Sequence, residues 1–458
     1  MSTRSTSRRE FLAAVGATSA ASILASSAAA PAAEGAEKLA VDGGTPVRKQ
    51  LLHHQPYGPQ FYDDVEKQEL IDVLESKAPF RWSAGDSKSL QFEKAYAAHI
   101  GVKHAIGVTS GTTALFTAMA AMEIGPGDEV IVPAWTWHSC WHAVVLAGAL
   151  PVCAEIDESF NLDPARVEGL ITPQTKVLMC VHLQGNPADM DRLLAVARKH
   201  GLKVLEDVSQ AVGASYKGRP LGSMGHIAAA SLQVNKTISA GEGGMVYAND
   251  AALMERAVRY HDAGGYRPVH QEWLGAARLD PMPGSNFRMT EFTGGVLLAQ
   301  VRKLDRIVAD IRRVARRVYD GIADVPGFRT RLLPDAAGEL GAGVYLDLGT
   351  NEARERFVAA MRAENLPAGG PSGSVVLPVQ PYAEKKLTVH RAWPTFNSAR
   401  GKAIQYGAAS CPRTLDILGR FGGVPLDPGY TESDTGDIVA AIRKVYPQVS
   451  GRPARPSA

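Results

Sequence analysis

The chain of 458 residues is poor in the features that mark several large classes of protein. It has four cysteines (Cys140, Cys153, Cys180 and Cys411), which are scattered without disulfide or metal-ligand spacing. Its formal net charge is +2, without a basic run or stripe, so nothing indicates a nucleic-acid partner. No segment approaches the roughly 18 uninterrupted apolar residues of a membrane-spanning helix. These absences favour a globular protein that acts on small molecules.

One cluster of metal-ligating residue types does occur, as His138-x-Cys140-x-His142. On a helix, His138 and His142 share a face, but Cys140 points away from them. The spacing therefore does not bring three ligands together, and we predict no metal site.

The first thirty residues resemble a targeting segment rather than part of the fold. Residues 7–12 read Ser-Arg-Arg-Glu-Phe-Leu, a twin-arginine signature, and an alanine-rich apolar stretch of about a dozen residues follows. The small residues at 28–30 provide a cleavage site. We therefore expect residues 1–30 to be a twin-arginine signal peptide and the protein to be exported to the periplasm or the extracellular space. The alternative is an unused leader on a cytoplasmic protein.

From residue 104 to 248, apolar runs of strand length alternate with amphipathic, helix-length segments, which is typical of an α/β fold with a mostly parallel sheet. A long amphipathic helix over 290–322 leads into a smaller C-terminal α+β domain, with a strand at 344–348 and helices at 352–364 and 432–445. The seven expected strands of the sheet lie at 104–108, 129–132, 152–156, 176–181, 203–206, 228–232 and 245–248. The expected divisions are an N-terminal arm at 31–60, a large domain at 61–305, a small domain at 306–447 and a tail at 448–458.

Two residues at the ends of these strands carry the chemistry. Asp207 ends one strand, and Lys236 follows another, just before the turn Gly241-Glu242-Gly243-Gly244. A lysine amine bonds covalently to the aldehyde of pyridoxal phosphate (PLP), and a carboxylate keeps its pyridine nitrogen protonated. Either residue alone is more often a surface charge or a turn former, but together with the glycine turn they predict a PLP site.

A second motif lies upstream, where Ser110-Gly111-Thr112-Thr113 opens a helix. Free backbone N–H groups, hydroxyls and the helix dipole make such a turn suitable for an anion, although an ordinary helix cap has the same composition. The next strand ends near Trp137, and an aromatic ring there can stack on a flat cofactor.

The combined motifs resemble those of the DegT/StrS family of PLP-dependent sugar aminotransferases, which have the fold-type I, aspartate aminotransferase-like architecture. The shared motifs are Glu206-Asp207-(x)2-Gln210, Ser231-Leu232-(x)3-Lys236, the glycine turn and the segment around Asn286. The family usually has Phe at the position of Leu232 and alanines at those of Gly294 and Gly295. The resemblance implies catalytic roles for Lys236 and Asp207, and cofactor-binding roles for Gly111, Thr112, Thr113, Trp137, Asp207, Gln210, Ser231, Lys236 and Asn286.

In the resembled family, Asn286 would complete the phosphate site of a neighbouring subunit, so we expect a homodimer with shared active sites. The resemblance also implies amino transfer from glutamate or glutamine to a small keto acceptor. Residues 39–48 and Gln233 resemble the branch that aminates keto-cyclitols, whereas other branches aminate nucleotide-linked keto-sugars. Residues 369–374 and 380–395 match no pattern.

Two alternatives stay open at this point. One is a catalytically silent PLP-binding sensor or scaffold, although Lys236, Asp207 and Ser231 are all present. The other is the deoxysugar dehydratase branch, in which a histidine replaces the lysine, although the presence of Lys236 argues against it.

Overall fold

The computed structural model describes residues 37–83 and 85–450. The expected signal peptide, residues 1–30, lies outside the described residues. Within the described part of the chain, no helix is both long enough and apolar enough to cross a membrane.

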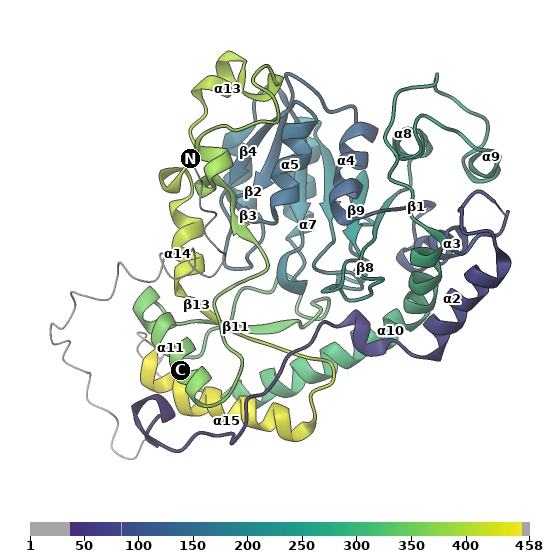
Figure 1. The fold of residues 1–458 in the computed structure, drawn as a ribbon. Helices are drawn as coiled ribbons and strands as arrows, with labels where there is room; N and C mark the ends of the chain where they lie inside the picture. Colours follow the sequence, from purple (N-terminus) through teal and green to yellow (C-terminus); the bar gives the residue numbers. More distant parts are fainter. Residues whose placement is uncertain (1–36, 84, 451–458) are drawn as a thin grey trace, which may run out of the picture. The chain divides into compact units, whose positions relative to one another are not determined.

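A seven-stranded sheet forms the centre of the fold, in the order β1-β10-β9-β6-β5-β2-β4 (Figure 1). Strand β10 runs antiparallel to both its neighbours, and the other pairs are parallel. The strands are β1 (His104–Val108), β2 (Glu129–Pro133), β4 (Leu150–Ala154), β5 (Thr175–Val181), β6 (Lys203–Asp207), β9 (Ile227–Ser231) and β10 (Gly244–Ala248). All seven predicted strands and the mostly parallel sheet are confirmed.

Strand β4 begins and ends two residues earlier than the predicted 152–156. The residue after its end, Glu155, is used elsewhere: its carboxylate accepts the backbone N–H groups of Arg413 (3.0 Å) and Thr414 (2.8 Å) at the start of α14 (Pro412–Arg420). The two partners of this contact are more than 250 residues apart in the sequence, so the pattern of apolar residues cannot predict it.

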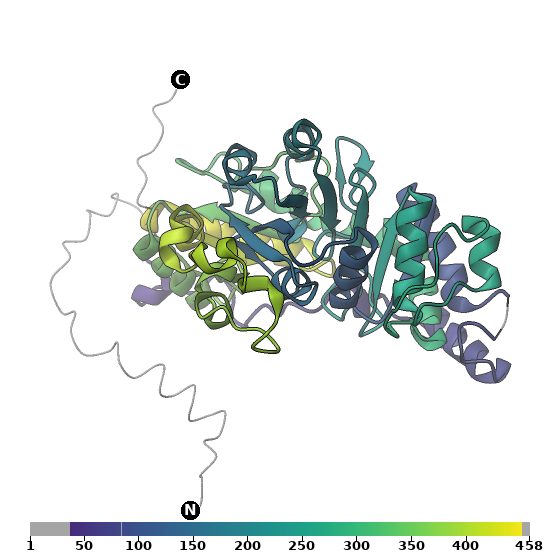
Figure 2. The same cartoon turned by 90° about the horizontal axis from the view of Figure 1, so that it is seen from above.

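Helices cover both faces of the sheet, as Figure 2 shows from above. Along β2, Val130 and Val132 belong to one apolar core and Ile131 to the other, as alternation along a strand requires. The first core is built with α4 (Gly111–Ala121), α5 (His138–Leu146) and α8 (Ala251–His261), and the second with α3 (Lys88–Ile100), α7 (Met190–His200) and α10 (Glu291–Ile322).

The long helix predicted over 290–322 is α10, and Thr290 caps it by accepting the N–H of Thr293. Its paired glycines permit close packing within the chain. A Cβ on Gly294 would lie 2.6 Å from the Ser89 backbone on α3, and one on Gly295 would lie 3.3 Å from the carbonyl of Glu69 on α2 (Asp64–Ser76). The alanine that the family usually carries would therefore clash at position 294.

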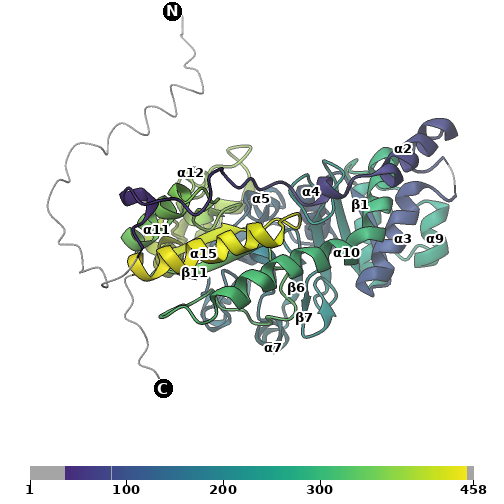
Figure 3. The same cartoon turned by 90° about the horizontal axis from the view of Figure 1, so that it is seen from below.

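A second, two-stranded sheet lies in the C-terminal part, where β11 (Gly343–Asp347) pairs antiparallel with β13 (Phe421–Pro425). It shares a core with α11 (Asn351–Ala363), α15 (Glu432–Val449) and the end of α10. Figure 3 shows α15 beside α10, and the N-terminal arm running from near α11 toward α2. The strand at 344–348 and both helices were predicted, but β13 was not. The domain divisions themselves stay a prediction.

The remaining elements are short and lie in connections. The helices are α6 (Pro164–Val167), α9 (Pro268–Leu274), α12 (Pro381–Glu384) and α13 (Ala399–Ala403), and the strand pairs are β3 (Trp135–Thr136) with β12 (Val375–Val376) and β7 (Ser215–Tyr216) with β8 (Arg219–Pro220).

Candidate active site

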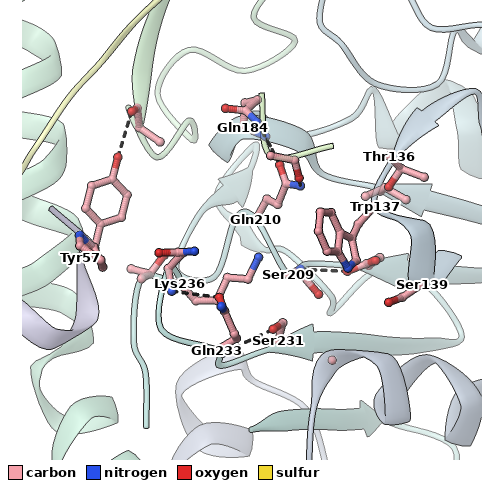
Figure 4. A pocket seen from close by; sticks show the side chains of 18 of the residues that line it. Tyr57, Thr136, Trp137, Ser139, Gln184, Ser209, Gln210, Ser231, Gln233 and Lys236 are labelled. Atoms are coloured by element: carbon pink, nitrogen blue, oxygen red, sulfur yellow. Dashed lines mark hydrogen bonds between the residues drawn. The ribbon is translucent and has the colours of Figure 1, made fainter. Parts of the chain in front are cut away.

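A cavity of about 570 Å³ lies at the carboxyl ends of the parallel strands, where ligands bind in open α/β sheets (Figure 4). Val181, Asp207 and Ser231 end β5, β6 and β9 at its floor. The predicted residues that border it are Gly111, Thr112, Trp137, Asp207, Gln210, Ser231 and Lys236. The fold therefore brings together most of the residues that the sequence analysis selected.

The N-terminus of α4 forms one end of the cavity. Ser110 caps the helix by accepting the N–H of Thr113 (3.1 Å), and Thr112 Oγ1 lies 2.7 Å from Ser139 Oγ. A Cβ on Gly111 would lie 2.5 Å from the Ser231 Cβ, so only glycine permits this approach of the helix to β9. Backbone N–H groups at a helix start, flanked by hydroxyls, suit a phosphate.

Thr113 was predicted to contact the phosphate together with Gly111 and Thr112, but its side chain lies elsewhere. It does not border the cavity, because its hydroxyl accepts the Ser110 N–H (3.0 Å) and closes the capping box. Thr113 thus shapes the turn that presents Gly111 and Thr112. Its direct contact with a phosphate stays a prediction.

Lys236 and Asp207 are charged residues of the cavity, together with the exposed Glu242. Burial lowers the pKa of the Lys236 amine, and the nearby Asp207 carboxylate opposes that shift. Asp207 is buried, and it accepts the Ser209 N–H (3.0 Å) on one oxygen and the Cys140 thiol (3.3 Å) on the other. A lysine whose pKa is lowered is a better nucleophile and base at neutral pH.

Trp137 and Gln210 occupy the sides of the cavity. The Trp137 side chain is 51% exposed, in contrast to the buried Trp135 and Trp141, so a ring face is free for a flat ligand. The Gln210 amide donates to Ser374 Oγ (3.0 Å) and to the Gly373 carbonyl (3.2 Å), which ties it to a segment distant in sequence.

The His138-x-Cys140-x-His142 cluster lies at the start of α5. The rings of His138 and His142 stack with centroids 6.0 Å apart, and His138 Nδ1 lies 2.9 Å from the Tyr382 hydroxyl. Cys140 points to the other side, toward Asp207, and burial raises its pKa well above the ordinary value. Among the described residues, no group of three or more His, Cys, Asp or Glu side chains is arranged to hold a metal.

Asn286 lies apart from the cavity. It is exposed, its Oδ1 accepts the Arg288 N–H (3.4 Å), and its backbone bridges to Asp262. Its predicted role concerns a second subunit, so both that role and the homodimer stay predictions.

Several cavity residues were missed by sequence reasoning. His54 and Tyr57 come from the N-terminal arm. The Tyr57 hydroxyl lies within hydrogen-bond distance of the carbonyls of Ala342 (2.9 Å) and Leu426 (2.7 Å), which share its single proton. Others come from the connection after β5, from β11 and from the unassigned segment 369–374. They are Gln184, Tyr345, Ser372 and Gly373. Of the two unassigned segments, only 369–374 supplies residues to the cavity wall.

The residues present fit PLP. A half-buried lysine, a buried carboxylate, an exposed aromatic face and a glycine-hydroxyl helix start surround one cavity, and each matches one part of that cofactor.

Comparison with known proteins decides the family, because the model for the DegT/DnrJ/EryC1/StrS aminotransferase family matches residues 62–395. The chain belongs to this family. It is therefore a PLP-dependent aminotransferase.

Named relatives and solved structures agree with this assignment. The L-glutamine:2-deoxy-scyllo-inosose aminotransferase of Streptoalloteichus tenebrarius is 32% identical over 426 residues, covering 89% of this chain and 97% of the relative. GDP-perosamine synthase of Caulobacter vibrioides is 46% identical over 226 residues, but the match spans only 49% of this chain and 59% of the relative. The crystal structure of 3-amino-5-hydroxybenzoic acid synthase is similar with a TM-score of 0.72 and 30% identity, over 87% of this chain and 100% of that chain.

Proposed function

We propose that this enzyme transfers the amino group of glutamate or glutamine to the ketone of an uncharged polyhydroxylated ring, with a keto-cyclitol as the preferred acceptor. The observation that supports this proposal is the chemistry of the cavity wall. Apart from Lys236, the described residues around the cavity include no lysine and no arginine.

The remaining wall suits hydroxyl groups better than phosphates. Its polar side chains are mostly neutral amides and hydroxyls, namely those of Gln184, Gln210, Gln233, Asn235, Ser209 and Ser372. Burial lowers the pKa of His54 and so favours its neutral form, and the exposed Glu242 carboxylate would oppose the concentrated negative charge of a diphosphate. A nucleotide diphosphate is normally bound by arginine or lysine, whereas amides pair with hydroxyls as donor and acceptor.

The relatives include enzymes for both classes of acceptor. A protein that acts on an inosose, by its name, is 32% identical over 89% of this chain, and a protein that aminates a UDP-linked sugar, by its name, is 32% identical over 75% of it. The choice between the two classes therefore depends on the cavity wall. Gln233, which resembles the keto-cyclitol branch, borders the cavity.

The roles of the individual residues follow from their positions. When bound, PLP supplies a ring that withdraws electrons from the carbon bearing the amino group. Asp207 would hold a positive charge on the pyridine nitrogen, and Trp137 would cover one ring face. The Lys236 amine, whose pKa burial lowers, would take the proton from the substrate Cα and return it.

The test is a comparison of acceptors with the purified holoenzyme. Glutamine and glutamate serve as donors, and the acceptors are a keto-inositol and a nucleotide-linked 4-keto-sugar. We expect a higher kcat/KM for the keto-inositol and no turnover by Lys236→Ala. A higher kcat/KM for the nucleotide-linked sugar would overturn the proposed acceptor. A cofactor spectrum unchanged by either donor would instead contradict the proposed donors.

We further propose that the enzyme is exported in folded form. The support is the twin-arginine signature at 7–12 and the small residues at 28–30. Cell fractionation should find the protein outside the cytoplasm, and the double substitution Arg8→Lys, Arg9→Lys should retain it inside. Equal distribution of both forms would refute export by this route.

A further inference from the structure

The segment after Gly369 borders the cavity but is held there by few contacts of its own backbone. Gly369 pairs with Gly423 before the segment, and β12 pairs with β3 after it. Between these anchors, the hydrogen bonds to residues 370–374 in the described chain come from two glutamine side chains. Gln184 Nε2 donates to the Ser372 carbonyl, and Gln210 Nε2 donates to Gly373 and Ser374.

Gln184 is the centre of this arrangement (Figure 4). Its backbone N–H donates to Gln210 Oε1 (3.1 Å), and its own side-chain oxygen accepts the Tyr345 hydroxyl. One residue thus connects the end of β5, the end of β6, strand β11 and the segment 370–374.

The backbone at Gln184 is itself unusual. Its φ is 54° and its ψ is 37°, a left-handed conformation that is unfavourable for a residue with a Cβ and is often found at functional sites. Its carbonyl accepts a hydrogen bond from Arg331 (2.8 Å), a fully buried guanidinium that is paired with Glu339. The fold therefore holds the backbone of Gln184 in a strained conformation, and the side chain of this residue borders the cavity.

We propose that Gln184 is a positioning residue for the acceptor: together with Gln210 it fixes residues 370–374 as the wall against which a ring-shaped acceptor binds. This inference rests on the proposed function. Glutamine and a cyclitol are of similar size, but a cyclitol carries hydroxyl groups around its whole ring and can bind a wall of hydroxyl and carbonyl groups along its edge. The wall therefore matters more for the acceptor than for the donor.

The experiment compares Gln184→Ala and Gln184→Glu with a matched control, Gln380→Ala, in the holoenzyme. Gln380 also donates to a nearby backbone carbonyl, that of Val376 (3.1 Å), but it does not border the cavity. Glutamate keeps the size of Gln184 and the acceptor for Tyr345, but as a carboxylate it has no N–H for Ser372. Both Gln184 variants should therefore behave alike, whereas an effect of side-chain volume would appear in Gln184→Ala alone.

Two measurements decide the outcome. The N–H groups that can report on the segment are those of its two anchors, Gly369, which donates to Gly423, and Leu377, which donates to Ala134. Hydrogen exchange of these two amides, in peptides covering 369–377, should accelerate about tenfold in both Gln184 variants, as expected for the loss of one or two net hydrogen bonds that hold the segment. The KM for the acceptor should rise by about tenfold while the single-turnover rate with the donor, followed by cofactor absorbance, stays within about threefold. The Gln380→Ala control should change neither.

Unchanged exchange or an unchanged acceptor KM would overturn the proposal, and so would an equal loss in the donor half-reaction. Failure of the proposed function has a different signature. The wild-type enzyme would then reject uncharged ring acceptors, while the exchange comparison, which needs no acceptor, would still decide whether Gln184 holds the segment.

Discussion

The neighbouring acids Glu206 and Asp207 on β6 provide a direct test of the site assignment. Side chains alternate along a strand, so the two carboxylates face opposite sides of the sheet. Asp207 borders the cavity, whereas the fully buried Glu206 lies 3.2 Å from His182 Nε2 and accepts the N–H groups of Gly222, Met224 and Gly225.

Asp207→Asn should impair chemistry but not folding. An asparagine oxygen can still accept the Ser209 N–H, so the free energy of unfolding should stay within about 1 kcal/mol of the wild-type value. Without the carboxylate charge, the ring nitrogen is no longer held in its protonated state. The loss of a preorganised charge typically costs about 10²–10³ in rate, or about 2.7–4 kcal/mol, and we expect amino transfer to slow by that factor.

Glu206→Gln should have the opposite effect. Burial alone would raise the pKa of Glu206, but the hydrogen bonds from His182 and the backbone amides of Gly225 and Gly222 outweigh it and lower the pKa. A glutamine has one oxygen for these donors, and each buried donor left without a partner costs about 1–3 kcal/mol. The free energy of unfolding should therefore fall by about 3–5 kcal/mol, as when a buried charged network is broken.

Urea unfolding and single-turnover transfer measure these two effects separately. The rate per folded Glu206→Gln molecule should stay within about threefold of wild type, since no atom at the cavity changes. A full wild-type rate in Asp207→Asn would show that its charge is not used. If both variants lost rate equally at unchanged stability, the assignment of opposite faces would be wrong.

Three further results are expected. Borohydride reduction of the holoenzyme and peptide mapping should place the pyridoxyl label on Lys236, and a label on another lysine would contradict the site. Mixing Lys236→Ala chains with Asn286→Ala chains should partly restore activity through mixed dimers; no recovery after proven subunit exchange would mean that each site is built within one chain. Burial lowers the pKa of both His261 and His270 from 6.5 to about 3. The unfolded chain therefore binds more protons than the folded chain between these values, and stability should fall as the pH drops from about 6.5 toward 3. In urea titrations at several pH values, His270→Phe should reduce the dependence of the free energy of unfolding on pH. An unchanged dependence would show that His270 does not cause it.

The residues that fit PLP could be predicted, because short stretches of sequence around each of them show where it lies in a strand or helix. Asp207 and Ser231 are the last residues of apolar runs, Lys236 follows one, and Gly111 opens a helix, so periodicity alone places them at the same edge of a sheet. The strand boundaries were less predictable: β4 ends at Ala154, and the next residue, Glu155, instead contacts Arg413 and Thr414 far along the chain.

The part of the cavity that we propose binds the acceptor was not predictable, because its residues are held by contacts between distant parts of the sequence. The left-handed backbone of Gln184 is held by Arg331, 147 residues away, and its side chain contacts Ser372, 188 residues away. Strand β13 has two glycines among its five residues, so its pairing with β11 is visible only in the folded chain. No periodicity within 369–374 indicates that this segment borders a cavity.

The residues that fit PLP and the residues of the proposed acceptor wall come from different parts of the chain. The residues that fit PLP lie between Gly111 and Lys236 on the ends of the central strands, where any displacement would disturb the chemistry. The proposed acceptor wall instead combines the arm at His54 and Tyr57, strand β11 and the segment 370–374, which Gln184 and Gln210 hold by side-chain hydrogen bonds. The arm is tied to Lys236, because the Gly58 N–H donates to the Lys236 carbonyl (3.1 Å). Substitutions in the segment 370–374, in contrast, can reshape the wall without moving Lys236 or Asp207. Acceptor preference should therefore be separable from amino transfer. The feature from which the acceptor should be inferred is the polar wall, in which the described residues include no lysine or arginine apart from Lys236.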